Sequence, residues 1–337
     1  MHAVRLRLAH AWRPFRQASP TARFLVFSGV AITVSFVLVA FVGDAVYPYG
    51  GTQYQVEAGA GTEQLDRLAE PSAEHPMGTT RDRYDVLARV IGGARLALSV
   101  VLFSTLLAMG VGVPLGLLSG YRGGRIDRLL VTLMDAVYVF PPLLLAIIVA
   151  FMLAAYLQPG VPSAAAAVGV VYIPQYFRVV RNHTLSVKEE PFVEAARSLG
   201  AKQRTVVTRY VFFNVVQSVP VIFTLNAADA VLTLASLGFL GYGVQPPTPE
   251  WGYDISQAVI DITAGVWWTA MWPGLAIVLL VTGLTLVGEG LNDVVNPLLR
   301  SRGLAGVKIG PDHAPAAGHG QEETSDPATT GGTVGDR

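Results

Sequence analysis

The chain has 337 residues, of which 52% are hydrophobic and 14% are charged. Soluble domains carry about 25% charged residues. The 24 basic residues here balance the 24 acidic ones, so the composition excludes an ordinary soluble domain, a disordered chain and a nucleic-acid binder. Because the chain has no cysteine, disulfides and cysteine-based metal sites are excluded as well, and a membrane protein remains.

Long runs without charge predict an all-α integral membrane protein with six transmembrane helices. A helix needs about 20 apolar residues to cross about 30 Å of hydrocarbon. In chain order, we expect spans near residues 24–43, 96–118, 133–157, 161–177, 215–240 and 269–288. The chain then divides into an N-terminal tail 1–23, the first helix 24–43, an outer loop 44–95, a five-helix core 96–290 with the loop 178–210 inside it, and a largely disordered tail 291–337.

The charges of the loops predict the orientation of these spans. The loop 178–210 has seven basic and three acidic residues, whereas residues 44–94 have eight acids and four arginines. Basic loops stay in the cytoplasm, so we expect both termini there and the chain to be a multi-pass protein of the cell membrane. A cleaved signal peptide is the competing interpretation of the first run, but that run is longer than the apolar segment of about 7–15 residues in such peptides.

Motifs of catalysis are missing from the sequence. None of the three lysines follows a glycine, which excludes a phosphate-binding loop, and none of the six histidines has the spacing of a metal site. His75, in the outer loop, is expected to be solvated. We therefore predict no catalytic residue, no metal and no cofactor bound by this chain.

Three polar residues inside the predicted spans are candidates for a translocation path. Asp135 is near the start of the third span, and Asn226 and Asp229 are three residues apart in the fifth, on one helix face. Ionisable groups at this depth are costly and therefore often functional. The alternative is a polar contact between helices or a side chain that snorkels to the membrane interface, which we favour for Asp135 and leave open for Asp229.

The loop 178–210 contains a predicted short helix with one apolar stripe. Pro191 suits its first turn and Gly200 suits its end. The stripe, at positions i, i+3, i+4 and i+7, consists of Phe192, Ala195, Ala196 and Leu199. A helix of this kind can dock on another protein, or it can rest on lipid headgroups.

Several segments resemble one family of transporters. Glu194-Ala195-Ala196 followed by Gly200 is similar to the EAA…G signature of permease subunits of ABC importers. The segments 75–79, 85–95 and 237–252 resemble the dipeptide/oligopeptide/nickel permeases, and most closely the C-type one of their two permease subunits.

The resemblance implies an importer driven by other chains. Two ABC ATPase subunits, which use ATP and Mg, would dock on a cytoplasmic coupling helix between spans four and five, formed by Phe192, Glu194, Ala195, Ala196, Leu199 and Gly200. The further implied partners are a second permease subunit, which completes a heterodimer, and an extracytoplasmic solute-binding protein. The implied cargo is a di- or oligopeptide or a related small solute.

Two departures from the family pattern have consequences. Phe212-Phe213 replaces a Leu-Pro pair, which predicts that the second helix of the loop continues into the fifth span. Leu234 stands where members often carry a glutamate, which directs attention to Asp229. The rival hypotheses are an ion- or proton-coupled secondary transporter that works without an ATPase, with Asp135 and Asp229 in its path, and a membrane-embedded enzyme, for which no catalytic cluster is found.

Overall fold

A computed structural model describes residues 20–47, 55–58, 61–64, 66–157 and 160–295. These residues belong to one compact unit, Met1–Pro297. Most of the predicted N-terminal tail and nearly all of the predicted C-terminal tail lie outside the described residues.

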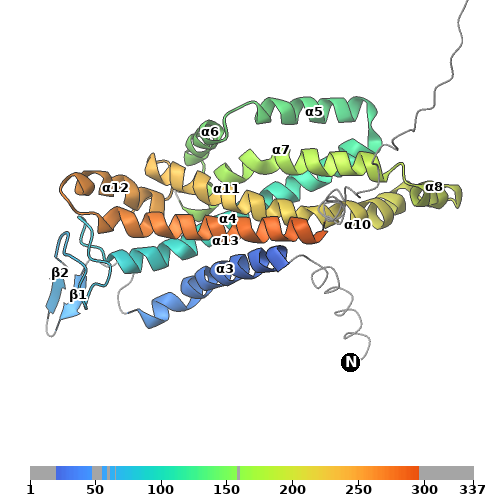
Figure 1. Cartoon of the computed structure of the whole chain (residues 1–337). Coiled ribbons are helices and arrows are strands. Elements are labelled where there is room, and N and C mark those ends of the chain that lie inside the picture. The colour runs from blue at the N-terminus through green and yellow to red at the C-terminus, as the bar shows by residue number, and fades with distance from the viewer. Residues whose placement is uncertain (1–19, 48–54, 59–60, 65, 158–159, 296–337) are drawn as a thin grey trace, which may run out of the picture. The chain divides into compact units, whose positions relative to one another are not determined.

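The unit is a bundle of long helices that run roughly side by side (Figure 1). Its longest helices are listed here with their bounds: α3 (Pro20–Val46), α4 (Val86–Arg122), α7 (Val161–Val187), α11 (Val219–Phe239) and α13 (Trp268–Val295). Five helical segments are long and apolar enough to cross a membrane, and a sixth span results if α5 (Gly124–Tyr138) and α6 (Pro142–Ala154) are counted as one. The predicted spans fall on these segments, most of which extend further along the chain than predicted.

The third predicted span is not one continuous helix, which corrects the expectation of a helix over 133–157. The axes of α5 and α6 meet at 96°. The break falls at Pro141-Pro142, because the first proline holds an extended backbone (ψ 129°) and the second has no N–H to continue the ladder. The helical segment also begins earlier than predicted, directly after Gly123.

Three glycines bring α4 into close contact with α7. Gly112, Gly116 and Gly120 are spaced by four residues and share one face of α4. A Cβ atom on each would lie 2.7 Å from a backbone carbonyl oxygen of α7. Small residues at this spacing let two helices in a membrane approach closely, so this pair forms the centre of the bundle.

The two ends of the bundle differ in their secondary structure. At one end, here called the α8 end, lie α8 (Pro191–Ser198), α9 (Gln203–Thr205), the π-helix η1 (Val206–Val211), α10 (Phe212–Val215) and η2 (Val216–Ser218). The opposite end, the α12 end, carries the helix α12 (Trp251–Thr263) and an antiparallel pair of strands, β1 (Gln55–Ala58) and β2 (Gly61–Gln64) (Figure 1). Neither α12 nor the strand pair, whose register places Val56 opposite Glu63, was part of the all-α prediction.

Candidate functional site

The predicted short helix of the loop is confirmed as α8. Pro191 is its first residue, and Gly200 follows its end with φ +79°, a conformation that glycine adopts without a steric penalty. The backbone N–H groups of Gly200 and Ala201 donate to the carbonyl groups of Arg197 and Ala196 and close the C-terminus. The two residues that bound the helix therefore act as the sequence predicts.

The face that α8 buries differs from the predicted stripe. Val193 and Ala196 are buried, at 0% and 6% exposure, and the helix packs against η1 through this side. Phe192, Ala195 and Leu199 are exposed, Leu199 at 88%. Ala196 thus belongs to the inner face, and the exposed stripe is narrower than predicted. The chain does offer α8 a surface of its own to pack on, which the sequence did not indicate.

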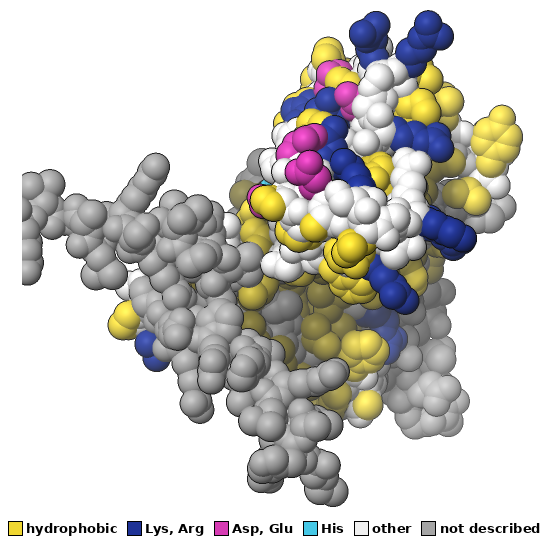
Figure 2. Space-filling view, turned by 90° about the vertical axis from the view of Figure 1, so that its right-hand side faces the viewer, with side chains coloured by type: hydrophobic (Ala, Val, Ile, Leu, Met, Phe, Trp, Pro, Cys, Tyr) yellow, Lys and Arg dark blue, Asp and Glu magenta, His cyan; other side chains and the backbone are white. Residues whose placement is uncertain are grey.

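The exposed side of α8 also carries charge. Glu194 and Gly200 are exposed, and the guanidinium of Arg197 lies 5.5 Å from the ring centroid of Tyr121, at the end of α4. Figure 2, which views the molecule from the α8 end, shows Lys and Arg side chains around this face and acidic ones in a small group. Apolar and acidic groups of α8 are therefore presented within a basic surface.

The segment after α8 is helical without interruption from Gln203 to Phe239. The prediction that the loop helix continues into the fifth span is therefore confirmed. Within this segment η1 is a π-helix of six residues, a distortion that often marks functional positions. Because η1 packs on α8 and leads into α11, a displacement of α8 has a continuous helical connection to the middle of the bundle.

Asp135 makes a contact between helices, which is one of the alternatives that we favoured for it. Arg178 of α7 donates to its carboxylate at 3.0 Å, and the same guanidinium lies 4.1 Å from the Tyr138 ring centroid. A second pair, Arg181 with Asp127, joins α5 to α7 nearer the α8 end at 2.6 Å. Since α5 has no buried residue, these two ion pairs are the principal polar attachments of α5 to α7 in the described structure.

Asn226 and Asp229 are neighbours on α11, as their spacing predicts, but they differ in burial. Asn226 is 3% exposed and points into the bundle, whereas Asp229 is exposed. The carboxylate of Asp229 has no hydrogen-bond or ion-pair partner among the described residues. The two residues are about 60° apart around α11, which is enough to place one on each side of the boundary of the core.

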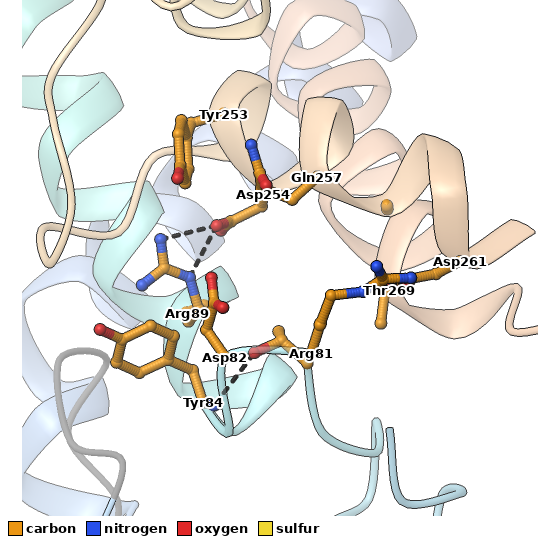
Figure 3. A pocket seen from close by; sticks show the side chains of 11 residues that line it. Arg81, Asp82, Tyr84, Arg89, Tyr253, Asp254, Gln257, Asp261 and Thr269 are labelled. Atoms are coloured by element: carbon orange, nitrogen blue, oxygen red, sulfur yellow. Dashed lines mark hydrogen bonds and ion pairs between the residues drawn. The ribbon is translucent and has the colours of Figure 1, made fainter. Parts of the chain in front are cut away.

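The α12 end holds a charged cluster that the sequence did not reveal (Figure 3). The guanidinium of Arg89, in the first turn of α4, donates to Asp254 Oδ1 of α12 from Nε at 2.7 Å and from Nη2 at 2.6 Å. Both side chains are buried, and Arg89 also donates to the carbonyls of Pro247 and Thr248. Burial raises the pKa of Asp254, while Arg89 opposes this shift. The pair fixes α12 to the start of α4.

Two further carboxylates organise the same end. Asp85 caps α4 by accepting from the Ala88 N–H at 2.8 Å, and it contacts His75 Nδ1 at 2.8 Å. His75 is therefore buried in a polar contact and not solvated as predicted. Glu250 caps α12 by accepting from the N–H groups of Gly252 and Tyr253 at 3.0 and 2.7 Å.

The environment of Glu250 is tight. Its carboxylate lies against Gly238 of α11, where a Cβ atom would overlap it. Burial raises the pKa of Glu250 to about 7, although the two backbone N–H groups lower it. Glu250 thus connects α12 to the last turn of α11.

The described residues contain no group of three or more His, Cys, Asp or Glu side chains arranged to hold a metal ion. The small cavity among Arg81, Asp82, Arg89, Asp254 and Asp261 has a volume of about 20 Å³, which is space for about one water molecule. This end of the molecule is built for contacts between helices.

Comparison with known proteins identifies the class to which this bundle and its α8 loop belong. The family model described as "Binding-protein-dependent transport system inner membrane component" matches residues 112–301. The chain belongs to this family, whose members are permease subunits of the inner membrane. The match begins within α4 and includes α8, the π-helix η1 and Asp254, whereas Arg89, the partner of Asp254, precedes it.

Curated relatives cover nearly the whole chain. A glutathione transport system permease protein GsiD of Pectobacterium atrosepticum is 35% identical over 291 residues, which are 86% of this chain and 92% of that protein. A dipeptide transport system permease protein DppC of Alkalihalophilus pseudofirmus is also 35% identical, over 86% of this chain and 91% of its own length. The resemblance to peptide-type ABC permeases is thereby confirmed.

A solved structure shares the fold. An inward-facing MetNI methionine ABC transporter contains a chain that superposes with a TM-score of 0.51 at 18% identity, covering 62% of this chain and 96% of that one. The helical bundle is therefore an ABC permease fold, and the chain itself is a transport subunit located in the membrane.

Proposed function

We propose that this chain is one of two permease subunits of an ATP-driven importer of small peptides. The relatives named for glutathione and dipeptide transport support the substrate class. A second permease subunit completes the path, and an extracytoplasmic binding protein delivers the peptide to the α12 end. In this arrangement the six spans place both termini and the α8 end in the cytoplasm, in agreement with the seven basic residues of the loop 178–210.

The observation that carries the proposal is the exposed surface of α8. Phe192, Ala195 and Leu199 form a small apolar surface, and Glu194 lies beside it. A helix with one face buried on its own chain and the other free is suited to enter a groove of an ATPase subunit. The ATPase subunits bind ATP and Mg, and their closure moves α8 together with η1, because Val193 and Val206 are both buried in the same core.

The translocation path runs along the exposed face of α11. Asp229 lies on that face, while Asn226 is buried beside it and Asp135 contacts Arg178 of α7. An importer of this kind requires the partner chains to hydrolyse ATP, and this requirement distinguishes it from an ion-coupled carrier.

Charge reversal on α8 tests the docking surface. Glu194→Lys, and separately Gly200→Pro, should abolish co-purification of the ATPase subunits with the tagged chain while insertion into the membrane is unchanged. Glu70→Lys, an exposed glutamate between β2 and α4, is the matched control and should leave co-purification intact. Normal ATPase recovery with both α8 variants contradicts the proposed docking site.

A further inference from the structure

Asp229 differs from the other acids in the helices α4 to α7 and α11. These helices contain three acidic residues, of which Asp127 and Asp135 each pair with an arginine of α7. Asp229 is exposed at the middle of α11, and the described residues provide no cation for it. A carboxylate at the centre of a spanning helix is costly in hydrocarbon, so it requires either water or a positive partner.

The surface around Asp229 is otherwise apolar. Leu225, Leu232 and Phe239 are exposed on the same side of α11. Towards the α12 end this side has a shallow, widely open cavity of about 370 Å³. Its walls come from four helices and include Leu143 of α6, Leu232, Ser236 and Phe239 of α11, Ile255 of α12 and Ile277 of α13. The face thus combines one negative charge with an apolar hollow of the size of small-ligand sites.

The spacing of the two features fits a short peptide. Leu232 and Ser236 lie about 4.5 and 10.5 Å from Asp229 along the axis, at about 1.5 Å of rise per residue. An extended peptide spans about 3.3–3.6 Å per residue, so two or three residues cover this distance. A peptide placed with its amino group at Asp229 therefore brings its next side chain to the apolar cavity.

We infer that Asp229 binds the α-ammonium group of the peptide in transit and that the cavity beside it receives an apolar side chain. This inference rests on the proposed function and adds a requirement to it, namely that the transported peptide carries a free amino terminus. A basic residue of the second permease subunit is the competing partner for the same carboxylate.

Cysteine labelling establishes whether Asp229 faces the path. Because the chain has no cysteine of its own, Asp229→Cys gives a single reactive thiol in this subunit. In the complete complex, made with cysteine-free partner subunits, a charged, membrane-impermeant methanethiosulfonate should modify this thiol, and a peptide substrate should slow the reaction. Asn226→Cys, on the buried side, is the matched control and should stay unmodified. Absence of labelling at 229, or labelling at the same rate with peptide present, overturns the inference.

Transport by the reconstituted importer tests the charge. The probes are alanyl-phenylalanine and its N-acetyl derivative, compared at equal occupancy of the binding protein. Asp229→Asn should lower uptake of the free peptide about tenfold, the size of one charge-assisted hydrogen bond, and leave the acetylated probe within about twofold. Asp229→Glu should retain uptake of the free peptide. Val34→Asn, which adds polarity at an exposed position of α3 without changing the charge, should affect neither probe.

The outcomes distinguish a failure of the inference about Asp229 from a failure of the proposed function. Equal loss of uptake for both probes, or loss of the second permease subunit from purified Asp229→Asn complexes, assigns the carboxylate to a subunit contact and overturns the inference alone. Unchanged uptake of both probes by Asp229→Asn also overturns the inference and leaves the proposed function standing. If the wild-type importer takes up no peptide when ATP is present, the proposed function fails, and the inference fails with it.

Discussion

Removal of the Arg89 side chain should destabilise the α12 end of the protein more than any surface substitution. In Arg89→Met, the carboxylate of Asp254 loses both of its hydrogen bonds, of 2.7 and 2.6 Å, and stays in a site where it is 9% exposed. The carbonyl oxygens of Pro247 and Thr248 lose a donor as well. Breaking a buried ion pair from one side costs about 3–5 kcal/mol, chiefly because the other charge is left without compensation.

The magnitude can be measured as a thermal midpoint in detergent. At about 2–4 °C per kcal/mol for a domain of 150–250 residues, the loss corresponds to a fall of about 6–20 °C. Arg178→Met is the matched control, since Arg178 pairs with Asp135 but the two side chains are 44% and 55% exposed. Surface pairs of this kind contribute about 0–1 kcal/mol, so its midpoint should change little.

A double substitution separates the charge from the packing. Arg89→Met combined with Asp254→Leu leaves no unpaired charge, and its midpoint should lie above that of Arg89→Met alone. If the midpoint of Arg89→Met falls no further than that of Arg178→Met, or if the double variant is the least stable of the three, the reasoning about the buried pair is refuted.

The remaining predictions concern three positions. Gly238→Ala should lower the free energy of unfolding by about 1–3 kcal/mol, because its Cβ overlaps the Glu250 carboxylate. Gly110→Ala, which faces open space, is the control and should be neutral or stabilising. Equal thermal midpoints for the two variants would contradict this packing. Gly200→Ala, at φ +79°, should destabilise the end of α8 by about 1 kcal/mol and weaken ATPase co-purification, which titration with purified ATPase would detect. The folded pKa of Glu250, about 7, exceeds its ordinary value of 4.5, so its stabilising contribution is complete below about pH 4.5 and is lost as pH rises through 7. The free energy of unfolding of Glu250→Gln, relative to that of wild type, should therefore rise by up to about 3 kcal/mol between pH 5 and pH 8. A difference between the two proteins that stays constant with pH would refute the raised pKa of Glu250.

The local parts of the site could be predicted because single residues determine them. Pro191 and Gly200 bound α8 by backbone preferences that act within one turn, and the Phe212-Phe213 pair permits the helix to continue towards α11. The spans followed from uncharged runs, since hydrocarbon excludes charge along any helix. The break at Pro141-Pro142 was missed because an uncharged run shows where hydrocarbon is tolerated and carries no sign of a change in direction.

The choice of buried face on α8 depends on residues elsewhere. An apolar stripe through Phe192, Ala195 and Leu199 and a second one through Val193 and Ala196 are both present in the helix. The second is buried because η1 presents Val206 to it, and nothing within α8 distinguishes the two. The same reason separates Asn226 from Asp229, because the boundary of the core passes between them.

The cluster at the α12 end could not be found from sequence spacing. Arg89 and Asp254 are 165 residues apart, and each is an ordinary charged residue in a segment predicted to be a loop. Their pairing depends on α12, which is too short to be recognised as a span. A signal was present in Glu250, an acid directly before an apolar helical pattern, which is typical of a helix N-terminus.

The central claim is that separate ATPase subunits drive this chain through α8. The most direct measurement is an affinity purification of the tagged chain from mild detergent, with the ATP hydrolysis of the eluate assayed beside that of the Glu194→Lys variant. The account predicts stoichiometric ATPase subunits and a second permease with the wild-type chain, and the loss of the ATPase with the variant. A chain that purifies without an ATPase, from a detergent that preserves other transporters of this class, would contradict it.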